Sequence, residues 1–191
     1  MTLHDKNSAR LAQERWLTAY YFTRATFSAA WVASALVLGQ QSLLFGAVLL
    51  LLYPLWDAAA NYLDATRNGG LARNRSQAIN LIASLVTALA VLAALQLGLG
   101  AVLTVFGAWA ILSGLLQLAT AVRRWTSAGA QWAMILSGAQ SALAGGFFIL
   151  QAQQGLPAVL PVIAGYAAFG AIYFLVSALS LLIGRRMLKS V

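Results

Sequence analysis

The stretch from Tyr53 to Gly70, YPLWDAAANYLDATRNGG, decides the predicted fold. It places Asp57, Asn61 and Asp64 at positions i, i+4 and i+7, so on a helix these side chains share one face. The ten residues before it, 43–52, are nearly all apolar, which is typical of a membrane span. Carboxylates are costly inside such a span, so they usually have a partner and often a function. The stretch therefore predicts a membrane helix with a polar face.

The composition of the whole chain agrees with a membrane protein. Its 191 residues are 61% hydrophobic and 8% charged, with a mean hydropathy of +0.80. A soluble domain of this size carries roughly a quarter of charged residues. There is no cysteine, so a disulfide framework, a thiol nucleophile and a thiolate metal site are excluded. We expect an all-α fold, a polytopic membrane bundle of six transmembrane helices.

Six segments reach the length of about 20 residues that a bilayer requires. They are residues 16–38, 43–63, 77–97, 101–122, 131–151 and 157–183. The expected organisation is a cytoplasmic N-terminal tail over 1–15, a six-span domain over 16–184 and a basic cytoplasmic tail over 185–191. The N-terminal tail is expected to be either a short interfacial helix or disordered.

The charge distribution predicts the orientation. Eleven of the twelve Lys and Arg residues lie in the two tails and in the loops between spans two and three and between spans four and five. The other three loops contain no charge of either sign. By the positive-inside rule both termini are cytoplasmic, and the expected location is a bacterial-type inner membrane. The net charge of +8 is explained by this topology and by anionic lipids, so we expect no nucleic-acid partner.

Spans two, four and six share a spaced motif of an aromatic residue and a small or polar residue. The three copies are Tyr53-x-x-x-Asp57-Ala58, Trp109-x-x-x-Ser113-Gly114 and Tyr173-x-x-x-Ser177-Ala178. They predict three αα-hairpin repeats of about sixty residues, which need one another to bury their packing faces. Chance alignment of Ala- and Gly-rich spans is the alternative.

Paired spans, tight outer turns and this motif resemble the HdeD-like membrane proteins. The residues that carry the resemblance are Gly107 to Leu116 (GAWAILSGLL), Tyr53 to Asp57 (YPLWD) and Arg24 in the first span, and it extends over essentially the whole chain. The resemblance implies a six-span inner-membrane protein linked to acid resistance, with no established biochemical activity. The polar stretch Asp57-x-x-x-Asn61-x-x-Asp64 departs from the usual pattern of that family.

The candidate catalytic residues are few. Asp57 and Asp64 lie seven residues apart on one helix, so their backbones differ in height by about 10 Å, too far to share a proton. His4 is the only histidine and lies in the tail, which excludes a Ser–His or Cys–His pair. We therefore expect no enzymatic activity, no metal site and no cofactor.

A polar cluster is predicted in the cytoplasmic half of the spans. Its members are Arg24, Asp57, Asn61, Asp64, Asn80 and Gln117. Arg24 and Asp57 each lie about eight residues into sequential antiparallel spans, so they are expected at equal depth, about 12 Å from the inner surface. We predict that they pair, because an unpaired charge at this depth costs several kcal/mol. The alternative is that Arg24 reaches the headgroups and Asp57 is protonated.

The remaining arginines are assigned to anionic lipid headgroups. These are Arg67, Arg73, Arg75, Arg123, Arg124, Arg185 and Arg186. Ser137, Ser141 and Gly145 form a stripe of small residues on span five, with spacing that lets two membrane helices approach closely. The contact is either within the chain or between copies, so a homo-oligomer is possible on this pattern.

Two functions are compatible with these residues. The first is a non-enzymatic, structural or stress-protective membrane protein whose polar cluster holds the helices together. The second is a carrier or binding protein for a small polar or lipidic molecule, with an inward-facing pocket beside Asp57. A water-filled cavity around Asp57 favours the second, and dry side-chain pairing favours the first.

Overall fold

The computed structural model describes residues 3–126, 131–155 and 159–189, and the side chains of these ranges between residues 11 and 184. Within them the chain forms six α-helices and no strand. The helices are α1 (Leu3–Val37), α2 (Leu43–Arg67), α3 (Arg75–Leu97), α4 (Leu99–Arg123), α5 (Gln131–Gln153) and α6 (Val159–Lys189). The all-helical prediction is therefore confirmed.

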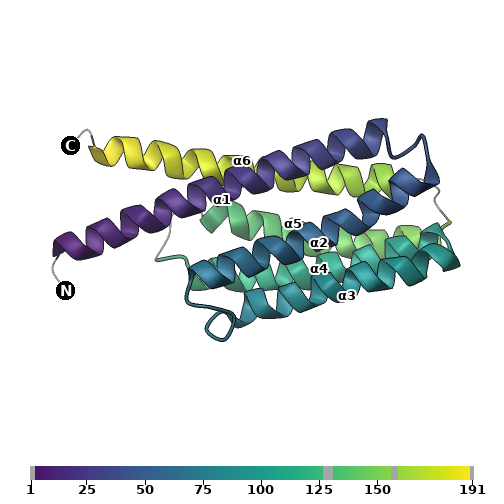
Figure 1. Cartoon of the computed structure of the whole chain (residues 1–191), viewed down its shortest axis with the longest axis horizontal. Helices are drawn as coiled ribbons and strands as arrows, with labels where there is room; N and C mark the ends of the chain where they lie inside the picture. Colours follow the sequence, from purple (N-terminus) through teal and green to yellow (C-terminus); the bar gives the residue numbers. More distant parts are fainter. Residues whose placement is uncertain (1–2, 127–130, 156–158, 190–191) are drawn as a thin grey trace.

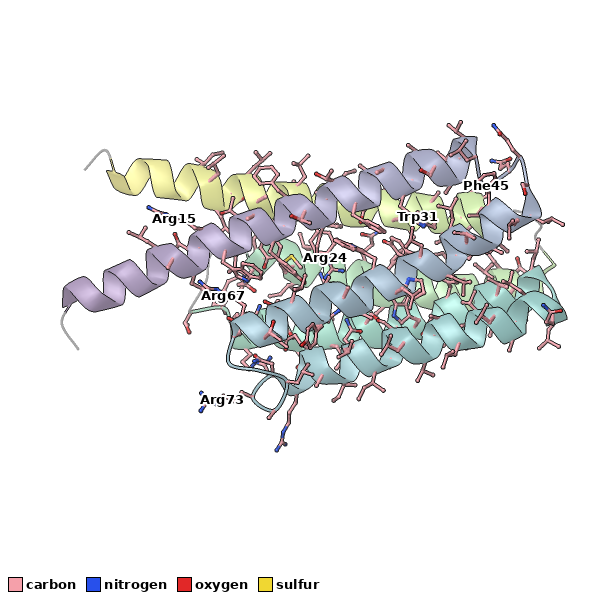
Figure 2. The ribbon with its side chains drawn as sticks, in the orientation of Figure 1. Arg15, Arg24, Trp31, Phe45, Arg67 and Arg73 are labelled. Carbon is pink, nitrogen blue, oxygen red and sulfur yellow. The ribbon has the colours of Figure 1, made fainter. Side chains whose placement is uncertain are left out.

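The six helices run side by side along the long axis of the molecule (Figure 1). Both ends of the chain and the connection from α2 to α3 lie at one end of the bundle, which we call the basic end (Figure 1). Arg67 and Arg73 are at this end, whereas Phe45 is at the opposite end (Figure 2). The arginine-rich connection from α2 to α3 therefore lies at the same end of the bundle as the two ends of the chain.

The helices form a ring in which each contacts the next, and α6 closes back on α1. The most extensive contacts join α4 with α5, α1 with α6, and α2 with α3. Sequential hairpin partners α1 and α2 contact each other much less. Each predicted hairpin therefore packs more extensively against the adjacent hairpins than its own two helices pack against each other.

Residue size explains which helices approach closely. On α4 and α5, Gly107 faces Gly145 and Gly114 faces Gly138, and the absence of a side chain lets the backbones meet. The small residues of span five therefore contact α4 within the chain. Between α1 and α2, by contrast, aromatic rings fill the space: Phe27 stacks on Trp56 with centroids 4.2 Å apart.

The bundle buries polar side chains and exposes apolar ones. Helix α3 shows this clearly, since Gln77, Asn80 and Ser84 are buried whereas Val86 and Leu89 are 57% and 67% exposed. Exposed leucines and valines over the length of a helix are stable against lipid tails and unfavourable in water. The structure therefore has the surface of a multi-pass membrane protein.

Five of the described helices are long and apolar enough to cross a membrane, namely α2 to α6. Helix α1 is not among them, because Arg24 lies in the middle of its most apolar part and its first half is polar. This helix runs unbroken from Leu3 to Val37, so the tail predicted over 1–15 is helical from Leu3 and continuous with the segment predicted as the first span.

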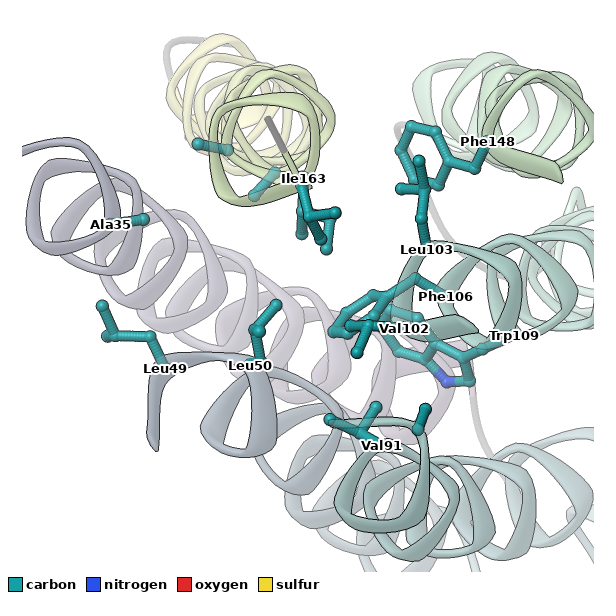
Figure 3. Packing of buried hydrophobic residues seen from close by; sticks show 14 of the residues in the cluster. Ala35, Leu49, Leu50, Val91, Val102, Leu103, Phe106, Trp109, Phe148 and Ile163 are labelled. Carbon is teal, nitrogen blue, oxygen red and sulfur yellow. The ribbon is translucent and has the colours of Figure 1, made fainter. Parts of the chain in front are cut away.

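An apolar cluster fills the half of the bundle away from the basic end. Figure 3 shows Phe106 and Leu103 of α4 with side chains of the other helices around them, among them Leu50, Val91 and Ile163. Phe106 and Ile163 are completely buried. Beyond this cluster, at the end opposite the basic loops, a separate cavity of about 480 Å³ lies among Gly39, Gly46, Leu50, Leu99 and Leu160.

Candidate functional site

Asp57 lies in the middle of α2 and is only 7% exposed. Its Oδ1 forms an ion pair with the guanidinium of Arg24 on α1, so the predicted pair is present. Arg24 also donates to the hydroxyl of Tyr20 over 3.2 Å, and its guanidinium lies 4.3 Å from the ring centre of Phe174 on α6. Figure 2 shows Arg24 between α1 and α2, well inside the bundle.

The second carboxylate oxygen of Asp57 accepts three hydrogen bonds. The donors are Asn61 Nδ2 at 2.9 Å, Asn80 Nδ2 at 3.2 Å and Ser84 Oγ at 2.9 Å. Four polar partners offset the cost of removing a carboxylate from water. Asp57 therefore has the environment of a fully paired anion.

Two further bonds extend this arrangement to α4. Trp109 Nε1 donates to Ser84 Oγ over 2.9 Å, and Ser113 Oγ donates to Asn80 Oδ1 over 2.8 Å. Arg24, Asp57, Asn61, Asn80, Ser84, Trp109 and Ser113 form what we call the Asp57 network. It joins four consecutive helices, α1 to α4, in the interior of the bundle.

Asp64 forms a separate cluster closer to the basic end. It is 4% exposed and pairs with Arg124, whose NH2 lies 3.0 Å from Asp64 Oδ2. Gln77 on α3 donates to the same oxygen over 3.0 Å, and Asn68 donates to Oδ1 over 2.8 Å. The end of α2 is thereby connected to the start of α3 and the end of α4.

The arginines assigned to lipid headgroups differ in their surroundings. Arg67, Arg73 and Arg75 are exposed at the basic end, and Arg67 lies over the ring of Trp16. Arg123 donates to Gln77, whereas the side chain of Arg124 is 15% exposed and paired with Asp64. Arg124 is therefore part of the interior polar cluster. The side chains of Arg185 and Arg186 lie outside the described part of the chain.

The six residues of the predicted polar cluster divide into three groups. Arg24, Asp57, Asn61 and Asn80 meet in one network, and Asp64 lies in the second cluster. Gln117 instead donates to the backbone oxygen of Met134 on α5 over 3.3 Å.

Sequence reasoning missed Gln77 and Ser84 as members of these clusters. The signal was present, because Gln77, Asn80, Ser84 and Thr87 recur at helical spacing and all four are buried. Such a face, polar on an otherwise apolar span, predicts the side that meets the other helices.

Beside the Asp57 network the structure contains a cavity of about 100 Å³. Every helix contributes to its wall, which includes Arg24, Tyr53, Trp109, Gln140 and Tyr166. The Asp57 carboxylate is paired with side chains, and a polar space adjoins it.

The two described aspartates are held apart by their partners. Asp57 and Asp64 each form an ion pair with a different arginine. Among the described residues, no three His, Cys, Asp or Glu side chains come close enough to hold a metal ion. The cavity wall instead offers hydroxyl, amide and aromatic groups, which suit binding.

Comparison with known proteins identifies one family model. Residues 82–150 match the model described as a short repeat of unknown function (DUF308). No curated protein and no solved structure matches the chain. The matched segment runs from α3 through α4 to α5 and contains the glycine contacts between α4 and α5. Because this family includes the HdeD-like membrane proteins, the match confirms over residues 82–150 the resemblance carried by the sequence.

Proposed function

We propose that the chain is a non-enzymatic, six-span protein of a bacterial-type inner membrane, with both termini in the cytoplasm. In this proposal its role is structural or stress-protective, and the Asp57 network holds the helices together. The DUF308 match and the apolar helices support a membrane protein of this kind. The acid-resistance role follows from the family resemblance alone.

One observation carries the proposal: Asp57 accepts from side chains on three helices at once. Its partners lie on α1, on α2 itself and on α3. Breaking such a buried pair by removing one partner costs about 3–5 kcal/mol, because the other charge is left without compensation. An arrangement this costly to disturb fixes the relative positions of the helices.

A second candidate is a binding or carrier protein for a small molecule. The cavity of about 100 Å³ beside Asp57 favours it, because a purely structural cluster does not require empty space next to it. The two candidates are compatible, since the Asp57 network can hold open the wall of the cavity.

A double-mutant cycle in detergent melts tests the structural role. We expect Arg24→Gln and Asp57→Asn each to destabilise the protein strongly, and the double variant to lose less than the sum by about 1–3 kcal/mol. Thr23→Ala is the matched control, because the Thr23 hydroxyl is exposed and bonds only the carbonyl of Ala19 in its own helix. Additive losses would contradict the network.

The stress-protective role requires a cellular test. Cells that lack this chain are expected to survive acid exposure less well than cells that produce it, and the Asp57→Asn variant is expected to restore survival incompletely. Equal survival with and without the chain would remove the stress role and leave the structural one.

A further inference from the structure

We propose that the central cavity binds one small uncharged molecule that carries a hydroxyl or amide oxygen. This inference rests on the second candidate function above and adds the chemical class of the ligand. It follows from the charge balance of the wall, from its unpaired polar groups, and from the size and closure of the space.

The wall of the cavity is electrically balanced. Its charged side chains are two arginines and two aspartates, and they form the pairs Arg24–Asp57 and Arg124–Asp64. A charged ligand would lose its hydration and gain no free counter-charge here, which is unfavourable in a medium of low dielectric constant. An uncharged ligand does not bear this cost.

Several polar groups in the wall have no partner of their own. The Nε of Arg24 and the Nε1 of Trp56 are buried and donate to no described residue. Both are hydrogen-bond donors, so they require an acceptor such as an oxygen atom. Ser137 and Gln140 on α5 also line the cavity, and they make no hydrogen bond to a described residue. Ser137 and Gln140 can each donate and accept, so a hydroxyl or amide group on the ligand suits them as well as the two donors.

The size of the space limits the ligand. A volume of about 100 Å³ corresponds to roughly three water molecules at about 30 Å³ each. The same space accepts one organic molecule of about four to six non-hydrogen atoms, whose carbon atoms would contact Tyr53, Trp109 and Tyr166.

The described wall of the cavity reaches towards the basic end. The wall extends towards the basic end as far as Ser76, Arg124 and Gln131, whereas the apolar cluster around Phe106 fills the opposite half. No residue of the turns at that opposite end, 38–42 and Gly98, lines the cavity. In this proposal the ligand enters and leaves at the basic end, because the buried cluster around Phe106 separates the cavity from the second cavity at the opposite end.

Saturation-transfer NMR on the full chain in nanodiscs tests the inference, with acetamide as the probe. We expect transfer to acetamide with a dissociation constant of about 1 mM, which suits a ligand of this size. Acetate and acetamidinium have the same number of non-hydrogen atoms as acetamide and carry opposite charges. Neither is expected to compete with acetamide.

Variants of α5 distinguish binding in the cavity from binding at the surface of the protein. Ser137→Leu fills part of the space and Gln140→Met removes a polar group from its wall, at positions that are not members of the Asp57 network, and each should reduce the transfer at least fivefold. Gly146→Ala is the control, because a Cβ at Gly146 on the same helix meets no atom within 4 Å. It should leave the transfer unchanged, and detergent melts establish that all three variants fold.

Three outcomes would overturn the inference. They are no transfer to acetamide, transfer in both α5 variants equal to that in the unaltered chain, and displacement of acetamide by an equal concentration of acetate. None of them bears on the cycle between Arg24 and Asp57, so the ligand site and the structural role can fail separately.

Discussion

Gly114 on α4 and Gly138 on α5 meet backbone to backbone. A Cβ atom on Gly114 would lie 2.5 Å from the carbonyl oxygen of Gly138, and one on Gly138 would lie 2.8 Å from the carbonyl oxygen of Gly114. One antiparallel register produces this contact and the contact of Gly107 with Gly145, seven residues along each helix. The two contacts together allow α4 and α5 to pack more extensively than any other pair.

The first prediction is that Gly114→Ala and Gly138→Ala each destabilise the protein. A methyl group at these positions meets backbone that cannot move independently, and overpacking of this kind costs about 1–3 kcal/mol. Gly146→Ala is the control, and it should be neutral or stabilising by up to about 1 kcal/mol, because alanine favours a helix and the position is open. Thermal melts in one detergent provide the comparison. Equal effects at all three positions would contradict the close contact.

The second prediction concerns Ser84, which connects Asp57 to Trp109. Its hydroxyl is fully buried, donates to the carboxylate and accepts from the indole N–H. Ser84→Ala leaves the indole donor unpaired and removes one donor from Asp57, at a cost of about 1–3 kcal/mol. Ser34→Ala should change stability by less than about 0.5 kcal/mol, since the exposed Ser34 hydroxyl bonds only Ala30 of its own helix. A loss at Ser84 no larger than that at Ser34 would exclude the bridging role.

The pair of Arg24 and Asp57 shows how far the sequence predicts the site. Equal depth on sequential antiparallel spans follows from counting residues, and an unpaired charge at that depth is costly, so the contact was predictable. The partners on α3 and α4 were harder to identify. Their selection depends on how far each helix is rotated, which side-chain packing determines and residue spacing alone does not.

The sequence pattern also did not predict which helices pack most extensively against one another. Alternating polar loops predict sequential hairpins, yet α1 packs more extensively on α6 than on α2. The physical reason is size: Phe27, Trp31, Tyr53 and Trp56 occupy the space between α1 and α2. Which helices lie close therefore depends on pairs of side chains that are distant in the sequence.

The third prediction is that Asn74→Ala loosens the connection between α2 and α3. The side-chain amide of Asn74 donates to the carbonyls of Asn68 and Gly70 over 2.8 and 2.9 Å, which holds the turn closed. Losing about 1–2 kcal/mol of local stability raises the open population roughly 5- to 30-fold. Trypsin should then cleave faster after Arg73 while the melting temperature changes little.

Thr66→Ala provides the control for this experiment, because the exposed Thr66 hydroxyl bonds only Leu63 in its own helix. An unchanged rate of cleavage after Arg73 in Asn74→Ala would mean that the amide does not restrain the turn.

The last prediction is the orientation of the bundle in the membrane. The chain contains no cysteine, so single-cysteine variants can be labelled without removing native thiols. Asn74 itself is a poor position, because its side chain is buried in the turn that it holds. Ala72 in the same connection is exposed, as are Gln41 and Gln153 near the opposite end.

The positive-inside rule places the arginine-rich connection in the cytoplasm. An impermeant maleimide applied to intact cells should therefore label Gln41→Cys and Gln153→Cys, and should label Ala72→Cys only after the membrane is opened. Labelling of Ala72→Cys from outside, with protection of the other two, would reverse the orientation and would place the mouth of the cavity on the outer face.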